Sequence, residues 1–99
     1  MMDLVFLLSA DIDVQQAYEY YENYQEGRGG LFMRHLDAAC AHLRQFPKIA
    51  PVFHGGYRRL LVPRYPYGIF YTIESARIIV VAVTHFQQNP KDILRRLGP

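Results

Sequence analysis

The pattern of hydrophobic and polar positions in the first quarter of the chain changes from a short apolar run to a helical period. The apolar run over residues 3–8 predicts a first β-strand. From Ser9, apolar residues recur at i, i+3, i+4 and i+7, which predicts a helix with Ser9 as its N-cap. Asp11 and Asp13 would lie in its first turn, where the helix dipole favours negative charge. Its apolar face would carry Val14, Ala17, Tyr18, Tyr21 and Tyr24 or Gln25.

A second helical period follows a glycine-rich break. Gly27, Gly29 and Gly30 are expected to end the first helix, and a second helix is predicted over residues 31–46. The Phe46-Pro47 pair ends it, because the residue before a proline is disfavoured in the α region. Two helices with a short link predict an antiparallel helical hairpin. The apolar stripe of the second helix is Phe32, Leu36, Ala39, Cys40 and Leu43.

The second half of the chain reads as strands. Residues 47–56 are expected to form a loop, and three β-rich runs then cover residues 57–62, 69–73 and 77–86, separated by Pro/Gly and polar breaks. The third run is apolar throughout residues 78–83, which predicts a strand buried on both faces in the middle of a sheet. Asn89-Pro90 would begin a short last helix, with Gly98 just beyond its end.

The order of predicted elements is β-α-α-β-β-β-α, which indicates an α+β fold. We expect an antiparallel sheet, made of the N-terminal strand and a three-stranded meander. The helical hairpin would pack on one face of this sheet, and a short C-terminal helix would follow. The 99 residues are expected to form one domain, near the lower size at which a single core suffices.

Composition narrows the class of protein. An apolar share of 51% and a charged share of 20% are typical of a folded domain rather than a disordered chain. A single cysteine excludes an internal disulfide and fits a reducing cytosol. No apolar run approaches the roughly 18 residues of a membrane span. The sequence therefore predicts a cytoplasmic protein with no membrane partner.

Charge is distributed unevenly around a net value of +2. Residues 1–46 hold seven acids and three arginines, a net charge of −4. Residues 47–99 hold eight basic residues and two acids, a net charge of +6. This asymmetry predicts a basic face on the C-terminal half, which would suit an anionic ligand or an acidic protein surface.

The candidate site lies along the meander. Arg58 and Arg59 are neighbours on one strand, so they should point to opposite faces of the sheet. Arg64 and Tyr67 fall in or beside the next turn, and His85 ends the third strand. We expect these five residues to contact a protein partner. Tyr67 could instead pack the turn beneath the sheet, and Arg59 could instead form a structural ion pair with an acid of the helices.

His85 is the best candidate for chemistry, because imidazole exchanges protons near neutral pH. His85 and Arg59 could supply two of the roles of a ribonuclease, a base and a phosphate-binding cation. A second acid or base is not visible in the sequence, so a structural or partner-binding role for His85 stays open. The other histidines show no metal-ligand spacing, and no phosphate-binding loop or nucleophile motif occurs. We therefore expect no metal and no cofactor.

Five motifs in this order resemble a known family over nearly the whole chain. They are Asp13-Val14-x-x-Ala17-Tyr18-x-Tyr20-Tyr21, Phe46-Pro47, Tyr57-Arg58-Arg59, Tyr65-Pro66-Tyr67-Gly68-Ile69-Phe70-Tyr71 and Val81-Ala82-Val83-Thr84-His85. The chain is similar to the RelE/ParE superfamily of bacterial toxins from type II toxin–antitoxin systems, in its ParE-like, plasmid-stabilisation branch.

This resemblance implies a small cytoplasmic toxin that is neutralised by an antitoxin and that meets DNA only through the antitoxin. RelE-type members cut mRNA on the ribosome, whereas ParE-type members poison DNA gyrase. RelE-type nucleases carry a catalytic Arg at the position of Gly68, so the resemblance favours a non-enzymatic ParE-like toxin. Two Arg usually follow the His in ParE-like chains, and this chain has Gln87-Gln88 there.

Three functions are left open by the sequence. The leading hypothesis is a toxin that binds a protein target, DNA gyrase being the expected one. The alternatives are a ribosome-dependent mRNA endoribonuclease and a degenerate homologue that binds an antitoxin without being toxic. The antitoxin's identity and the stoichiometry of the complex cannot be read from the sequence.

Overall fold

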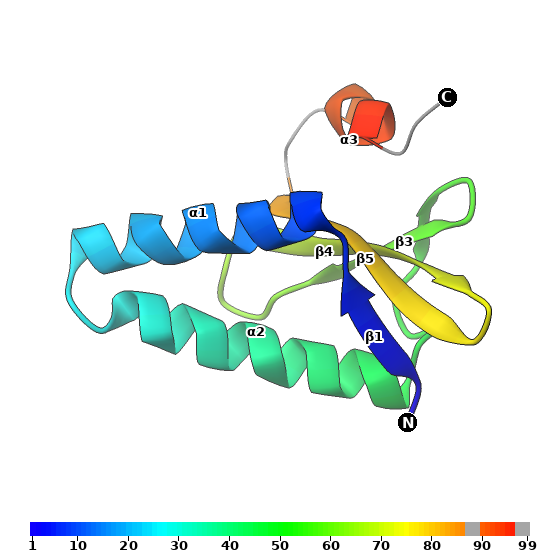
Figure 1. Cartoon of the computed structure of the whole chain (residues 1–99), viewed down its shortest axis with the longest axis horizontal. Helices are drawn as coiled ribbons and strands as arrows, with labels where there is room; N and C mark the ends of the chain where they lie inside the picture. The colour runs from blue at the N-terminus through cyan, green and yellow to red at the C-terminus, as the bar shows by residue number, and fades with distance from the viewer. Residues whose placement is uncertain (87–89, 97–99) are drawn as a thin grey trace.

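A five-stranded mixed sheet with a helical hairpin on one face forms the centre of the computed structural model, which describes residues 1–86 and 90–96 (Figure 1). The elements are β1 (Asp3–Phe6), α1 (Leu8–Tyr24), α2 (Arg28–Gln45), β2 (Val52–His54), β3 (Tyr57–Leu61), β4 (Tyr67–Glu74), β5 (Arg77–His85) and α3 (Pro90–Arg96). The predicted α+β fold, helical hairpin, meander and C-terminal helix are confirmed. The expected Asn89 cap, Gln87-Gln88 and Gly98 lie outside the described residues.

The sheet is not purely antiparallel as predicted. Its order is β1-β5-β4-β3-β2, and β1 runs parallel to β5. The reason is topological: the chain leaves β1 through the two helices, reaches the far edge at β2, and returns strand by strand to the side of β1. The predicted central position of the most apolar strand is confirmed, because β5 lies between β1 and β4.

Two segment boundaries also differ from the prediction. Residues 52–54, expected in a loop, form the edge strand β2, which pairs with β3 across a turn where Gly55 has a φ of 56°. The second helix begins at Arg28 rather than near residue 31. The carboxylate of Glu22 accepts the backbone N–H groups of Gly27 (3.1 Å) and Gly29 (3.0 Å), so these donors at the helix start are satisfied.

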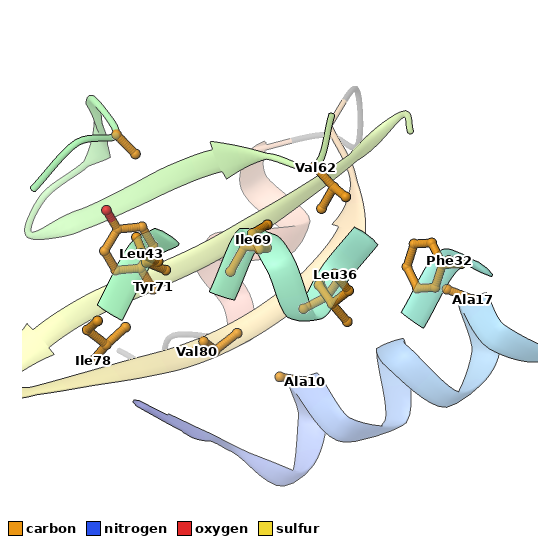
Figure 2. Packing of buried hydrophobic residues seen from close by; sticks show 13 residues of the cluster. Ala10, Ala17, Phe32, Leu36, Leu43, Val62, Ile69, Tyr71, Ile78 and Val80 are labelled. Carbon is orange, nitrogen blue, oxygen red and sulfur yellow. The ribbon is translucent and has the colours of Figure 1, made fainter. Parts of the chain in front are cut away.

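The hairpin and the sheet enclose the larger of two apolar clusters. Helix α2 contributes Phe32, Leu36 and Leu43, and the sheet contributes residues such as Tyr71 and Val80 (Figure 2). The closest helix contact uses buried Gly29, where a Cβ atom would lie 2.7 Å from Cε2 of Tyr18. Only a glycine allows the two helices to approach in this way.

A smaller cluster lies on the other face of the sheet. It consists of Phe70, Val81 and Ala82 with Ile93 of α3. A β-bulge between β4 and β5 pairs Phe70 with Ala82 but Tyr71 with Val80, leaving Val81 as the extra residue. Because of this bulge, Val80 and Val83 both join the cluster beneath the hairpin, while Val81 and Ala82 both face α3.

Candidate functional site

The two neighbouring arginines of β3 point to opposite faces, as predicted. Arg58 pairs with Tyr71 of β4, on the face of the hairpin, whereas Arg59 pairs with Phe70 on the other face. The guanidinium of Arg58 donates to the backbone oxygens of Ala50 (2.6 Å) and Lys48 (3.4 Å). It therefore fastens the segment between α2 and β2, and is turned toward its own main chain.

Arg59 fills a space that a side chain at position 68 would otherwise occupy. A Cβ atom built on Gly68 would lie 3.1 Å from Cγ and 3.3 Å from Cδ of Arg59. The guanidinium lies over the ring of Phe53, with Cζ 5.1 Å from the centroid, and donates to the backbone oxygen of Phe86 at 3.3 Å. The stem of Arg59 thus covers the position at which a RelE-type nuclease would carry its arginine.

The β3–β4 turn presents one exposed cation above a packed aromatic cluster. Arg64 is exposed and has a φ of 72°, a conformation that is uncommon for a residue other than glycine. Tyr67 is half-buried, and its ring centroid lies 5.4 Å from that of Phe32 and 6.1 Å from that of Tyr21. Burial, with Tyr20 and Asp13 nearby, raises the pKa of Tyr67. Tyr67 therefore packs under the turn and stays protonated at neutral pH.

His85 does not share a face with Arg59. The register places His85 opposite Tyr67 and Arg59 opposite Phe70, and these two β4 residues point to opposite faces of the sheet. His85 is exposed and lines a cavity of about 360 Å³ on the α1 side. The other lining residues are Asp13, Gln16, Ala17, Tyr20, Tyr67, Val83, Thr84 and Arg96. Hence the structure does not bring together the two residues proposed for a nuclease.

An ion pair between Asp13 and Arg96, which no local sequence pattern indicates, lies at this cavity. Asp13 is 7% exposed, and its Oδ2 accepts the backbone N–H of Val83 at 3.0 Å. Arg96 of α3 approaches the same carboxylate with two nitrogens, at 2.5 Å and 2.9 Å. The hydrogen bond to Asp13 raises the pKa of Arg96, against the opposing effect of partial burial. This contact joins α1, β5 and α3.

The side chains of Ser9 and Asp13 both form hydrogen bonds to the backbone of β5, which is not the role that the sequence predicted for them. Strand β1 ends at Phe6, so beyond Val80 strand β5 pairs with β4 on one side and, among the described residues, with no strand on its β1 side. The hydroxyl of Ser9 donates to the backbone oxygen of Val81 at 3.0 Å, and Asp13 accepts from Val83. The helix begins at Leu8 with no side-chain cap bond. The N-cap role of Ser9 and the first-turn position of Asp13 were therefore wrong.

Within the described residues, other groups show little reactive character. Burial, with a smaller effect of Asp37, raises the pKa of the Cys40 thiol to about 11, so it is protonated and a poor nucleophile at neutral pH. No group of three or more His, Cys, Asp and Glu side chains is arranged to hold a metal ion in the part of the chain that is described.

The described helices include none that is long and apolar enough to cross a membrane.

Comparisons with known proteins agree with this fold and assign a family. A solved structure titled "Chromosomal ParDE TA system from P. aeruginosa" is similar, with a TM-score of 0.76 and 18% sequence identity. The match covers 86% of this chain and 96% of that chain. No curated protein matches the sequence. The profile of the family described as the ParE toxin of the type II toxin–antitoxin system, parDE, matches residues 4–90. The chain belongs to the ParE toxin family of type II toxin–antitoxin systems.

Proposed function

We propose that this chain is a toxin that arrests growth by binding a protein target and that a cognate antitoxin neutralises it. A binding mechanism, rather than catalysis, is supported by the surroundings of Gly68 and by the place of His85 in the sheet. The stem of Arg59 covers Gly68, and His85 lies on the opposite face of the sheet from Arg59. A ribonuclease needs its base and its phosphate-binding cation on one side of the substrate, and this placement argues against such a site.

DNA gyrase is the target that resemblance to ParE-type toxins implies. We place the target contact at the β3–β4 turn of the basic meander, with Arg64 as its exposed cation and Tyr67 and His85 beside it on the hairpin face. Arg59 lies on the other face and is left outside this contact. Arg64 is the strongest member, because it is exposed at a tight turn and the turn limits its backbone freedom. Arg58 has a structural role beside this surface, because its guanidinium donates a hydrogen bond to the backbone oxygen of Ala50.

The direct assay is supercoiling of relaxed plasmid by purified gyrase, with and without the chain. We expect inhibition that Arg64→Glu removes and Arg64→Lys largely retains, because a charge reversal repels an acidic partner. Arg34→Glu, an exposed substitution on α2, is the matched control and should inhibit like the parent chain. Full supercoiling at saturating protein, together with growth arrest in cells, excludes gyrase as the target.

Two further outcomes test the alternatives. Defined cuts in mRNA on translating ribosomes, lost in His85→Ala, would establish the endoribonuclease and overturn the binding mechanism. Normal growth on overexpression would favour the non-toxic homologue that binds an antitoxin.

The antitoxin is proposed to cover an apolar stripe along the outer side of α1. Leu8 and Ile12 lie one turn apart, as do Tyr20 and Tyr24, and exposed Gln16 separates the two pairs along the helix. The exposed fractions of the four apolar residues run from 49% for Ile12 to 74% for Leu8. A small domain with such an exposed stripe gains from a partner segment with an apolar face, and an acidic segment of the same partner suits the basic meander.

Co-purification and thermal unfolding test this second contact. A partner that binds only the folded chain raises its unfolding temperature, so the neighbouring gene product should stabilise it. Ile12→Lys should weaken complex formation, whereas Ile49→Lys, an exposed apolar position in the segment between α2 and β2, should not. An equal loss in both variants would place the antitoxin elsewhere.

A further inference from the structure

A cavity with an apolar lining lies at the end of the molecule away from the α1–α2 link. It has a volume of about 540 Å³ and opens between the C-terminal end of α2, the start of β1 and strand β4. This volume falls in the usual range of small-molecule sites, about 300–1,000 Å³. Its lining consists of Met2, Gln45, Phe46, Pro47, Lys48, Ile49 and Ile73.

The wall of this cavity is apolar and partly exposed to solvent. Phe46 is 49% exposed and Ile49 is 50% exposed, while Met2 and Ile73 are half-buried. Exposed apolar side chains that surround a hollow gain free energy when an apolar ligand displaces water from them.

The backbone oxygens around the cavity already have donors. The oxygen of Met2 accepts from Nε of Arg44 (3.1 Å), and that of Phe46 accepts from the N–H of Ile49 (3.1 Å). The hydroxyl of Tyr71 donates to the oxygen of Pro47 (2.6 Å). In addition, Arg58 donates to the oxygen of Lys48. Each of these four oxygens thus already accepts one hydrogen bond from within the chain, which leaves it less capacity for a cationic ligand.

The charged residue in the wall of the cavity is basic, and the nearby acids Asp3 and Glu74 both lie opposite Arg77 on the neighbouring strand. Lys48 is exposed and belongs to the lining, and the described lining residues include no acid. Arg44 and Arg58 donate to the backbone oxygens of Met2 and Lys48, so their positive charges lie close to the lining. The local field thus favours a ligand with negative charge.

We propose that this cavity binds a small anionic amphiphile. Its apolar chain or ring lies against Phe46, Ile49 and Ile73, and its carboxylate or similar anionic group lies at Lys48. The site is separate from the stripe on α1 and from the basic turn at Arg64, so it is independent of the toxin function proposed above.

The probe for this site is decanoate, titrated below its micelle concentration into the full-length chain and followed by NMR. We expect saturable shifts at Met2, Phe46, Ile49 and Ile73. Decyltrimethylammonium, with the same chain and the opposite charge, should bind more weakly. Equal binding of the two amphiphiles, or shifts spread over α1, would overturn the proposal.

Two variants with matched controls test the roles of charge and apolar contact. Lys48→Glu should weaken decanoate binding by roughly fivefold, the size of a reversed surface charge. Lys91→Glu, an exposed change on α3, should leave binding unchanged. Ile49→Gln should weaken binding by about tenfold, because it removes apolar contact. Val52→Gln, exposed on β2, is its control.

All four substitutions are at exposed positions, so their unfolding temperatures should match that of the parent chain. Loss of binding in the control variants as well would show non-specific association and overturn the site. Displacement of decanoate by the antitoxin would assign the cavity to that protein and would also overturn the small-molecule proposal.

Discussion

The two faces of the sheet are held in different ways. Beneath the hairpin, large side chains such as Phe32, Leu36 and Tyr71 are buried in one extensive cluster. On the other face, three buried residues of the sheet are covered by Ile93 of the short helix α3 and flanked by the Arg59 stem. The polar contact Asp13–Arg96 joins α3 to α1. Buried area therefore dominates one face, while a few specific contacts matter most on the other.

Because the two faces are held in different ways, we expect the residues that stabilise the fold and those that contact a partner to be different. The hairpin face provides most of the apolar burial, which is the main favourable term in folding. The opposite face and its rim carry arginines whose stems pack while their charged groups stay near the surface. Changes on the first face should reduce stability, and changes on the second should alter α3 or binding. Four predictions test this contrast, from the largest expected effect to the smallest.

Leu36→Ala should produce the largest loss. Leu36 is 2% exposed and lies between α2 and the sheet, so truncation leaves a cavity and should cost about 3–5 kcal/mol. Urea unfolding measures this loss. Leu31→Ala on the same helix is the control, because Leu31 is 41% exposed and should cost far less. Equal losses would mean that the hairpin does not dominate stability.

Asp13→Ala should cost about 2–4 kcal/mol, since it leaves the Val83 N–H and the Arg96 guanidinium without their acceptor. Amide exchange should also accelerate in α3, which loses its tie to α1. Asp11→Ala, an exposed change in the first turn, should stay within about 0.5 kcal/mol. Unchanged exchange in α3 would show that the ion pair does not hold this helix.

Gly68→Ala should cost about 1–2 kcal/mol, because the new methyl group crowds the stem of Arg59 at 3.1 Å and the ring of Phe70 at 3.3 Å. Adding Arg59→Ala should relieve part of the strain, so the double variant should lose less than the sum of the single losses. Gly56→Ala is the control, with its nearest atom 3.9 Å away. Strict additivity would show that the two positions are not coupled.

The smallest expected effect is the contribution of the Cys40 thiol to the pH dependence of the free energy of unfolding. The pKa of this thiol rises from about 9 to about 11 on folding, so the folded chain holds this proton more tightly than the unfolded chain. The resulting stability is present below pH 9 and is lost as pH rises toward 11. Between pH 7.5 and 9.5 we expect a loss of under about 1 kcal/mol. Urea unfolding should show this loss reduced in Cys40→Ala, and an identical pH dependence would contradict it.

Much of the fold could be predicted because its signals are local. The meander follows from β-rich runs separated by turn residues, and the hairpin follows from two helical periods around a glycine-rich link. The family resemblance rested on motifs in the same segments. By contrast, the candidate site depended on orientation. Arg58 and Arg59 were expected on opposite faces, but only the register with β4 showed which of them faces the hairpin.

The sequence by itself determined the identity and order of the main elements, because helical and strand periodicities are properties of short segments. The tertiary structure decided the parallel pairing of β1 with β5, the strand β2, and the contact between Asp13 and Arg96, which are 83 positions apart. It also decided that His85 and Arg59 lie on opposite faces. Long-range pairing and register depend on how all the elements pack together, and no local pattern contains that information.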